Sequence, residues 1–283
     1  RGEHLLTLCG HAGDVFCVAV DWTSQQALSG SRDRSLRHWD LSNGNLLQTF
    51  LAHKDAVRCV AVDWSARRFI SGSWDCMLNL WDLDKNEVLL ELQGHEGRVY
   101  CVDFNVSCGH ALSGSQDTSL RLWNLADGKS SKELKGHSSY VFSVSVDWLA
   151  SRALSGSKDA SLILWDLQDA QILQSFTSHT GPVRCVVVDW ASQLAISGGL
   201  DSTYCVWNLS TGEIVRVFVE VHKSDKEAGA RCIDANWTCK LALSGSMGSS
   251  LRVWNFESET LSVVQELTGH QDAVLCVASE WSS

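Results

Sequence analysis

Residues 11–40 read HAGDVFCVAVDWTSQQALSGSRDRSLRHWD, and this stretch decides the fold. Between Val15 and Trp22 the residues alternate with a period of two, which predicts a first β-strand. Residues 26–31 predict a second strand, and residues 35–41 predict a third that carries Trp39. Asn43-Gly44 is a strong hairpin signal and leads into a fourth strand at residues 46–51. The stretch therefore predicts a unit of four short antiparallel strands.

The same unit recurs along the whole chain of 283 residues. Five consecutive Trp residues lie 42 residues apart, and a sixth follows 47 residues later. Each is followed by Asp or Asn: Trp39-Asp40, Trp81-Asp82, Trp123-Asn124, Trp165-Asp166, Trp207-Asn208 and Trp254-Asn255. A period that runs from the first residues to the last leaves no room for a boundary, so we expect residues 1–283 to form one domain.

The repeat predicts an all-β architecture. The chain shows no helical periodicity and has a single proline, Pro182. A four-stranded sheet that is apolar on both faces is not stable alone, but sheets stacked radially bury one another's faces. A β-propeller is the arrangement that achieves this.

In its repeated columns the chain resembles the WD-repeat β-propeller family, and the resemblance covers essentially all of it. In that family a His before the first strand of a blade, a Ser or Thr in the second, an Asp in the next turn and the Trp of the third strand form a hydrogen-bonded tetrad. The resemblance implies five complete tetrads: His11, Ser29, Asp33, Trp39; His53, Ser71, Asp75, Trp81; His95, Ser113, Asp117, Trp123; His137, Ser155, Asp159, Trp165; and His179, Ser197, Asp201, Trp207.

The sixth unit departs from this pattern. It keeps His222, Ser244 and Trp254, but Gly248 stands where the tetrad Asp is expected. A polar insertion follows His222, so we expect this blade to be the loosest and its loop to be either a binding element or a tolerated insertion.

The two ends of the chain suggest a seventh blade. Residues 4–9 align with a fourth strand, and residues 272–281 align with a first strand, so one strand is left over at each end. The two leftover strands would be the outer and inner strands of a blade whose middle strands are absent. We therefore expect a seven-bladed ring with an incomplete seventh blade, cut as a window from a longer chain.

Composition narrows the classes of partner. A net charge of −10 and a pI near 5.4 argue against nucleic acid or an anionic membrane as the main partner. No apolar run approaches the roughly 18 residues of a membrane span. Six of the eleven cysteines occupy one repeat column as small apolar residues, which suits a reducing compartment. We expect a cytoplasmic protein, with the nucleus as the alternative.

The sequence carries no sign of catalysis, cofactor or metal binding. No serine lies on a G-x-S-x-G elbow, and neither a phosphate-binding loop, a dinucleotide fingerprint nor an HExxH motif occurs. Recurrence of the Ser/His/Asp sets around a ring favours a structural use over a nucleophile. A ring of Asp or Asn at the ends of the first strands predicts turn capping, and the Trp beside each predicts packing. A propeller enzyme is the distant alternative.

Binding is predicted at the positions that vary while the tetrads stay fixed. Two such columns lie at the end of the ring that carries the His and Asp turns, which we call the top face: the second residue of the first strand, and the residue before the tetrad Asp. Aromatic and arginine residues, which dominate interface hot spots, are frequent there. The expected protein-binding residues are Phe16, Arg32, Arg58, Trp74, Tyr100, Phe142, Lys158, Arg184 and Arg231.

The best interpretation is a non-catalytic scaffold that presents this top face to protein or peptide partners and is monomeric within larger complexes. A second interpretation rests on Arg32 and Arg58, which resemble positions in F-box/WD-repeat substrate receptors of ubiquitin ligases. The Arg in those slots of that family grips phosphorylated peptides, and bidentate Arg suits phosphate. Acidic or phosphorylated segments are therefore candidate ligands. Arg184 and Arg231 lie some blades away from the first pair.

Overall fold

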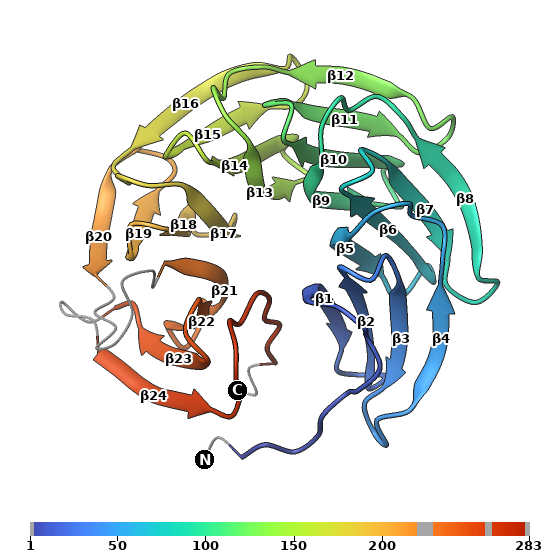
Figure 1. Cartoon of the computed structure of the whole chain (residues 1–283). Coiled ribbons are helices and arrows are strands. Elements are labelled where there is room, and N and C mark those ends of the chain that lie inside the picture. The colour runs from blue at the N-terminus through green and yellow to red at the C-terminus, as the bar shows by residue number, and fades with distance from the viewer. Residues whose placement is uncertain (1–2, 220–228, 258–261, 281–283) are drawn as a thin grey trace.

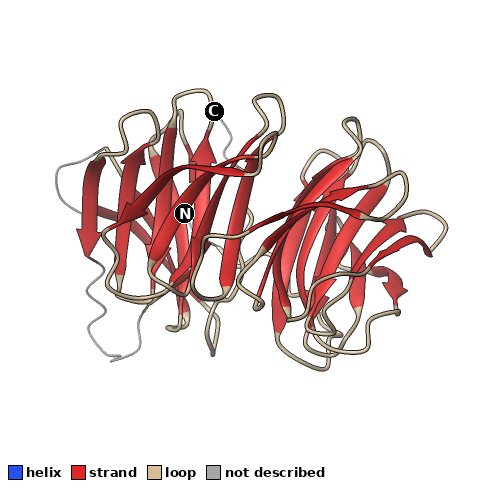
Figure 2. Ribbon diagram, turned by 90° about the horizontal axis from the view of Figure 1, so that it is seen from above, coloured by secondary structure: helices blue, strands red, loops and turns tan. Residues whose placement is uncertain are grey.

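A computed structural model describes residues 3–219, 229–257 and 262–280 of the chain. Within these ranges all regular structure is β-strand, in six four-stranded sheets that we call blades 1 to 6 (Figure 2). Blade 1 contains β1 (Val15–Asp21), β2 (Gln26–Ser31), β3 (Leu36–Asp40) and β4 (Leu46–Phe50); blade 2 contains β5 (Val57–Asp63), β6 (Arg68–Ser73), β7 (Leu78–Asp82) and β8 (Glu87–Leu92); blade 3 contains β9 (Val99–Asn105), β10 (His110–Ser115), β11 (Leu120–Asn124) and β12 (Ser130–Leu134). Blade 4 contains β13 (Val141–Asp147), β14 (Arg152–Ser157), β15 (Ser161–Asp166) and β16 (Gln171–Thr177); blade 5 contains β17 (Val183–Asp189), β18 (Leu194–Gly199), β19 (Thr203–Asn208) and β20 (Ile214–Val219); blade 6 contains β21 (Ala230–Asn236), β22 (Leu241–Ser246), β23 (Ser250–Asn255) and β24 (Ser262–Thr268).

The blades are arranged in a ring (Figure 1), and the inner strands of all six blades line a central channel. Within each blade consecutive strands pair antiparallel, the first strand lies innermost and the fourth lies on the circumference. The predicted propeller of four-stranded blades is therefore confirmed, and the four strand ranges predicted for the first repeat agree with β1 to β4 to within one residue at each end. No helix of the described residues is long and apolar enough to cross a membrane.

Hydrophobic packing between neighbouring blades holds the ring together. Between blades 1 and 2, Leu28, Leu36 and Phe50 of blade 1 pack against Val57 and Trp81 of blade 2. Each of these five side chains is at most 1% exposed. Equivalent clusters join blades 2 and 3, 3 and 4, 4 and 5, and 5 and 6. One blade alone would leave these faces in water, so the repeat is stable only as a stack.

The glycine of each Ser-Gly-Ser stretch allows the blades to approach closely. A Cβ atom added at Gly72 would lie 2.6 Å from the Cys59 sulfur and 2.7 Å from a methyl carbon of Val99 in the next blade. The buried Cys59 thiol therefore fills the space over this glycine, and burial raises its pKa. None of the eleven cysteines forms a disulfide. The cysteine column is thus packing, as its position in the repeat predicts.

The sector between blade 6 and blade 1 contains residues 272–280 on its inner side, but they do not form a strand. The Val274 amide donates to the Ser246 carbonyl oxygen (3.0 Å), and the Ser279 amide donates to a carboxylate oxygen of Asp234 (2.8 Å). These bonds put the segment in the place of an inner strand. The expectation that residues 4–9 and 272–281 are strands is wrong for their described part, because neither segment has a neighbouring strand to pair with.

Two blade faces remain incompletely covered at this sector. Val15 of β1 is 37% exposed, whereas the equivalent Val57 and Val99 are fully buried. Leu251 of β23 is half-buried, whereas the equivalent Leu120 is fully buried. Both residues occupy positions that elsewhere pack against the adjacent blade.

Candidate functional site

Each complete tetrad is a chain of hydrogen bonds from the core to the top face. In blade 2 the indole N–H of Trp81 donates to Ser71 Oγ (2.8 Å), and this hydroxyl bonds with His53 Nε2 (2.8 Å). His53 Nδ1 lies 3.0 Å from Asp75 Oδ2, which also accepts the backbone amide of Lys54 (2.8 Å). The predicted order of the network is therefore confirmed for this blade, and it fastens the loop before β5 to the turn after β6.

Blades 1, 3, 4 and 5 repeat this geometry, with Trp-to-Ser distances of 2.7–2.8 Å. Burial alone would raise the pKa of Asp33, but hydrogen bonds from Ser35, Ala12 and His11 hold that pKa well below its usual range. Burial lowers the pKa of His179, so a neutral imidazole faces an ionised carboxylate. Every tetrad serine is nearly or fully buried and already hydrogen-bonded, so none is placed as a nucleophile.

The sixth unit keeps only part of the network. Trp254 donates to Ser244 Oγ at 3.1 Å, which is longer than in the other blades. Gly248 supplies no carboxylate; its amide donates to Ser246 Oγ (3.2 Å). His222 and most of the insertion after it lie outside the described residues. The side chains of β23 are also less buried than those of the matching β15 and β19.

The Asp, Asn and Trp ring at the opposite end of the propeller is structural in its contacts. Asp21 accepts the backbone amide of Thr23 (3.0 Å), and Asp63 accepts that of Ala66 (2.9 Å). Four further members cap their own turns in the same way: Asn105, Asp147, Asp189 and Asn236. The half-buried Trp148, Trp190 and Trp237 pack against the inter-blade clusters.

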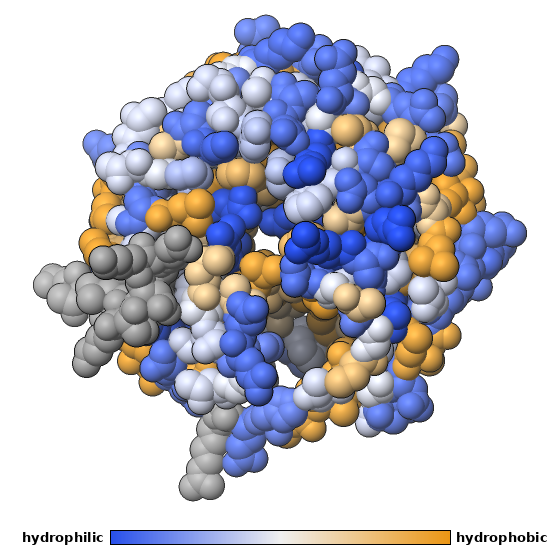
Figure 3. Space-filling model, in the orientation of Figure 1, coloured by the Kyte–Doolittle hydropathy of each residue, from blue (hydrophilic) through white to orange (hydrophobic). Residues whose placement is uncertain are grey.

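A pocket of about 820 Å³ opens at the centre of the top face, over the mouth of the channel. The face is hollowed at its centre, where hydrophilic residues border the upper and right sides of the opening and hydrophobic ones its lower side (Figure 3). Eight of the nine predicted binding residues line the pocket: Phe16, Arg58, Trp74, Tyr100, Phe142, Lys158, Arg184 and Arg231. A volume of this size suits a small ligand or the side chains of a bound peptide.

Arg32 is the predicted residue that does not line the pocket. Its side chain is largely exposed and lies 3.4 Å from the carboxylate of Asp14, with which it forms an ion pair. The pocket instead contains Arg98 and Tyr140, which the sequence did not single out. Both directly precede an inner strand, at a position that also varies from repeat to repeat, and this variation was the signal that could have found them.

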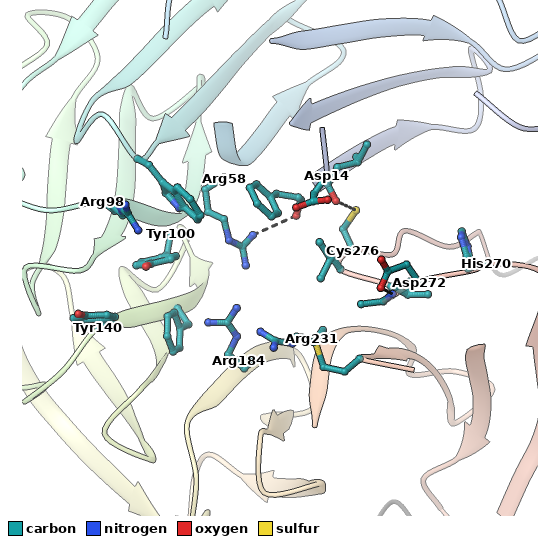
Figure 4. Close-up of a pocket in the computed structure, with 18 of the residues that line it drawn as sticks. Asp14, Arg58, Arg98, Tyr100, Tyr140, Arg184, Arg231, His270, Asp272 and Cys276 are labelled. Carbon is teal, nitrogen blue, oxygen red and sulfur yellow. Dashed lines mark hydrogen bonds between the residues drawn. The ribbon is translucent and has the colours of Figure 1, made fainter. Parts of the chain in front are cut away.

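Arginines from three blades converge in the pocket. Figure 4 shows Arg58, Arg184 and Arg231 with their guanidinium groups directed toward one another. The pKa of Arg184 is lowered to about 9, first by burial and then by the charges of Arg58 and Arg231. Arg184 and Arg231 belong to blades 5 and 6, some blades away from Arg58 as predicted, but their side chains meet because the inner strands of all the blades surround one narrow channel.

Cationic groups dominate this pocket although the chain is acidic. Its lining contains five Lys or Arg residues but only two carboxylates, Asp14 and Asp272. Within the described residues, no carboxylate forms an ion pair with Arg58, Arg98 or Arg184. Arg58 donates to the carbonyl oxygen of Phe16 (3.2 Å). The site can therefore accept an anion without first breaking an internal ion pair of these three residues.

Comparison with known families agrees with this architecture. A family model described as WD domain, G-beta repeat matches residues 2–40, 44–82, 86–124, 128–166 and 170–208. The chain belongs to the WD-repeat family. The five matched WD repeats are those with complete tetrads, and each match ends on the Asp or Asn that follows the tetrad Trp. The sixth repeat, with Gly248, lies outside the matched residues.

Several individual proteins are similar to a short part of the chain. Eukaryotic translation initiation factor 3 subunit I is 51% identical over 47 residues in Xenopus tropicalis, which is 17% of this chain and 14% of that protein. The Xenopus laevis protein is 52% identical over 52 residues (17% and 16%), and the Homo sapiens protein 47% identical over 47 residues (17% and 14%). The chain thus covers about one-seventh of these relatives, little more than a single repeat.

Proposed function

We propose that this WD-repeat protein is a non-catalytic, cytoplasmic interaction scaffold whose top-face pocket binds an acidic or phosphorylated segment of a partner protein. WD-repeat propellers are a protein-interaction scaffold type, and the ligand chemistry follows from the pocket. Five cations concentrated in one pocket of a chain with net charge −10 favour an anionic ligand.

The observation that carries the proposal is the state of Arg184. Its guanidinium is mostly buried, and its buried Nε has no hydrogen-bond acceptor within the described part of the chain. A buried charge is costly when nothing pairs with it, and here Arg58 and Arg231 add repulsion. A carboxylate or phosphate between these groups would offset both effects, and planar guanidinium groups bind such anions with two parallel bonds.

A phosphopeptide-reading substrate receptor of a ubiquitin ligase is a narrower version of this function. The convergence of Arg58 with Arg184 favours the binding of anions. It does not indicate that the protein is part of a ubiquitin ligase. Membership of a larger assembly, as the word subunit in the names of the translation initiation factor relatives suggests, is a further candidate. A match of about one repeat supports the shared fold, but it gives little support for a shared partner.

Binding of a library of acidic, phosphorylated and neutral peptides tests the proposal. Wild type should retain acidic or phosphorylated peptides, and the Arg58→Gln/Arg184→Gln variant should lose them. Arg67→Gln is the matched control, because Arg67 pairs with Asp84 at the opposite end of the propeller (2.7 Å). Equal retention by wild type and the double variant would dispose of the proposal.

A further inference from the structure

Four aromatic rings of the pocket each carry a cation of the pocket on their face. The Arg184 guanidinium lies 4.0 Å from the centre of the Phe142 ring, and that of Arg98 lies 4.3 Å from the centre of a Trp74 ring. The other two pairs are Lys158 over Tyr140 (4.4 Å) and Arg58 over Phe16 (5.6 Å). These are cation–π distances.

The pairs are built from the propeller's own repeat. Phe142 and Arg184 are both the second residue of an inner strand, in the adjacent blades 4 and 5. Phe16 and Arg58 are the corresponding residues of blades 1 and 2. An aromatic residue at this position therefore reaches the cation at the same position of the next blade, so each of these two pairs bridges two blades.

The rings are fixed in turn by other rings. Tyr100 lies edge-on to Phe142 with ring centres 5.1 Å apart, and Tyr140 lies edge-on to Phe142 at 6.2 Å. Phe16 and Trp74 have ring centres 5.4 Å apart. The surfaces on which the cations rest are thus held by aromatic contacts across several blades.

Resting a cation on a ring differs in one respect from pairing it with a carboxylate. A carboxylate would neutralise the cation and accept its N–H groups, whereas the face of a ring orders the guanidinium and leaves the in-plane N–H donors available. Ordering before binding also removes rotamer entropy that a ligand would otherwise have to overcome.

We infer that Phe16, Trp74, Tyr140 and Phe142 are positioning residues, which act on the ligand through the cations they support. This inference rests on the proposed function and deepens it, because it explains how the pocket keeps four of its five cations ordered without pairing them with a carboxylate of the described residues. Phe16, Trp74 and Phe142 are also predicted from the sequence to contact a partner directly, and that prediction stands beside this one. Each of the four rings has one of the chain's own Arg or Lys side chains over it.

Titration with inorganic phosphate at constant ionic strength tests the inference on the Phe142–Arg184 pair. Phe142→Leu should weaken phosphate binding roughly fivefold to thirtyfold, the range of a partly desolvated cation–π contact. Phe142→Tyr keeps a ring under Arg184 and should bind within about twofold of wild type. Arg152→Gln is the control, because Arg152 lies over Trp190 (5.7 Å) away from the pocket, and it should leave phosphate binding unchanged.

A spectroscopic readout separates positioning from general loss of structure. The Nε–H proton signal of Arg184 should show a ring-current shift in the ligand-free wild type and in Phe142→Tyr, and should lose it in Phe142→Leu. Phosphate binding by Phe142→Leu equal to that of wild type, alongside a loss in Arg184→Gln, would overturn the inference and leave the proposed function standing. Absence of saturable phosphate binding by wild type would overturn both.

Discussion

Replacing Ser113 with alanine should destabilise the propeller through one hydroxyl group. Ser113 Oγ accepts the indole N–H of Trp123 (2.8 Å) and bonds with His95 Nε2 (2.8 Å), and the serine is fully buried. Ser113→Ala leaves two buried polar groups without partners. Each orphaned group costs about 1–3 kcal/mol, so we expect a loss of about 2–6 kcal/mol in the free energy of unfolding.

Equilibrium unfolding in urea, followed by circular dichroism, measures this loss. The matched control is Ser143→Ala, because Ser143 Oγ is buried with no hydrogen-bond partner in the described part of the chain. Its removal should be neutral or slightly stabilising. Ser244→Ala should fall between the two, since its bond to Trp254 is longer (3.1 Å) and its unit lacks the Asp. Equal stabilities of Ser113→Ala and Ser143→Ala would refute the reasoning.

Three further predictions concern packing, charge and the incomplete sector. Gly72→Ala should cost about 1–3 kcal/mol of unfolding free energy in the same urea assay, because the new Cβ overlaps the Cys59 sulfur; an unchanged midpoint would contradict the close packing. Burial raises the pKa of Asp103 in the folded protein from 3.8 to about 6. The favourable contribution of Asp103 to the free energy of unfolding is therefore present below about pH 4 and is lost as the pH rises through about 6. The free energy of unfolding of Asp103→Asn should therefore rise by about 3 kcal/mol relative to that of wild type between pH 4 and pH 7. A constant difference in stability between the two proteins across that range would exclude the raised pKa of Asp103. A hairpin patterned on residues 26–40 and added after residue 283 should cover the exposed faces of Val15 and Leu251 and raise the thermal midpoint of unfolding; a scrambled hairpin that does as well would contradict this.

The fold could be predicted from the sequence because the repeat encodes it several times over. Alternation predicts each strand, turn residues such as Asn43-Gly44 end it, and the Trp column fixes the stacking partner. Residues 272–280 were predicted as a strand from alignment alone. A strand also needs a neighbouring strand to bond with, and the alignment of these residues with an inner strand did not take that requirement into account.

The site could be predicted only in part. Variable columns predicted eight pocket residues: six because the inner strand of every blade directs its second residue to the channel mouth, and Trp74 and Lys158 because they precede the tetrad Asp at the same end of the ring. Arg98 and Tyr140 were missed because they lie in turns, where side-chain direction depends on local backbone geometry. Arg32 lies outside the pocket, where it is exposed and paired with Asp14, so its role in binding stays a prediction. The meeting of Arg58 with Arg184 depends on the width of the channel, which the sequence does not state.

A double-mutant cycle between Arg184 and the charge of a bound peptide tests the central claim most directly. The four affinities are those of wild type and Arg184→Gln for a phosphorylated peptide selected from the library and for its unphosphorylated form. A charged hydrogen bond contributes about 1.5–3 kcal/mol, so we predict that phosphorylation improves binding to wild type roughly tenfold to a hundredfold more than binding to Arg184→Gln. An equal gain from phosphorylation in both proteins would contradict anion recognition by this pocket.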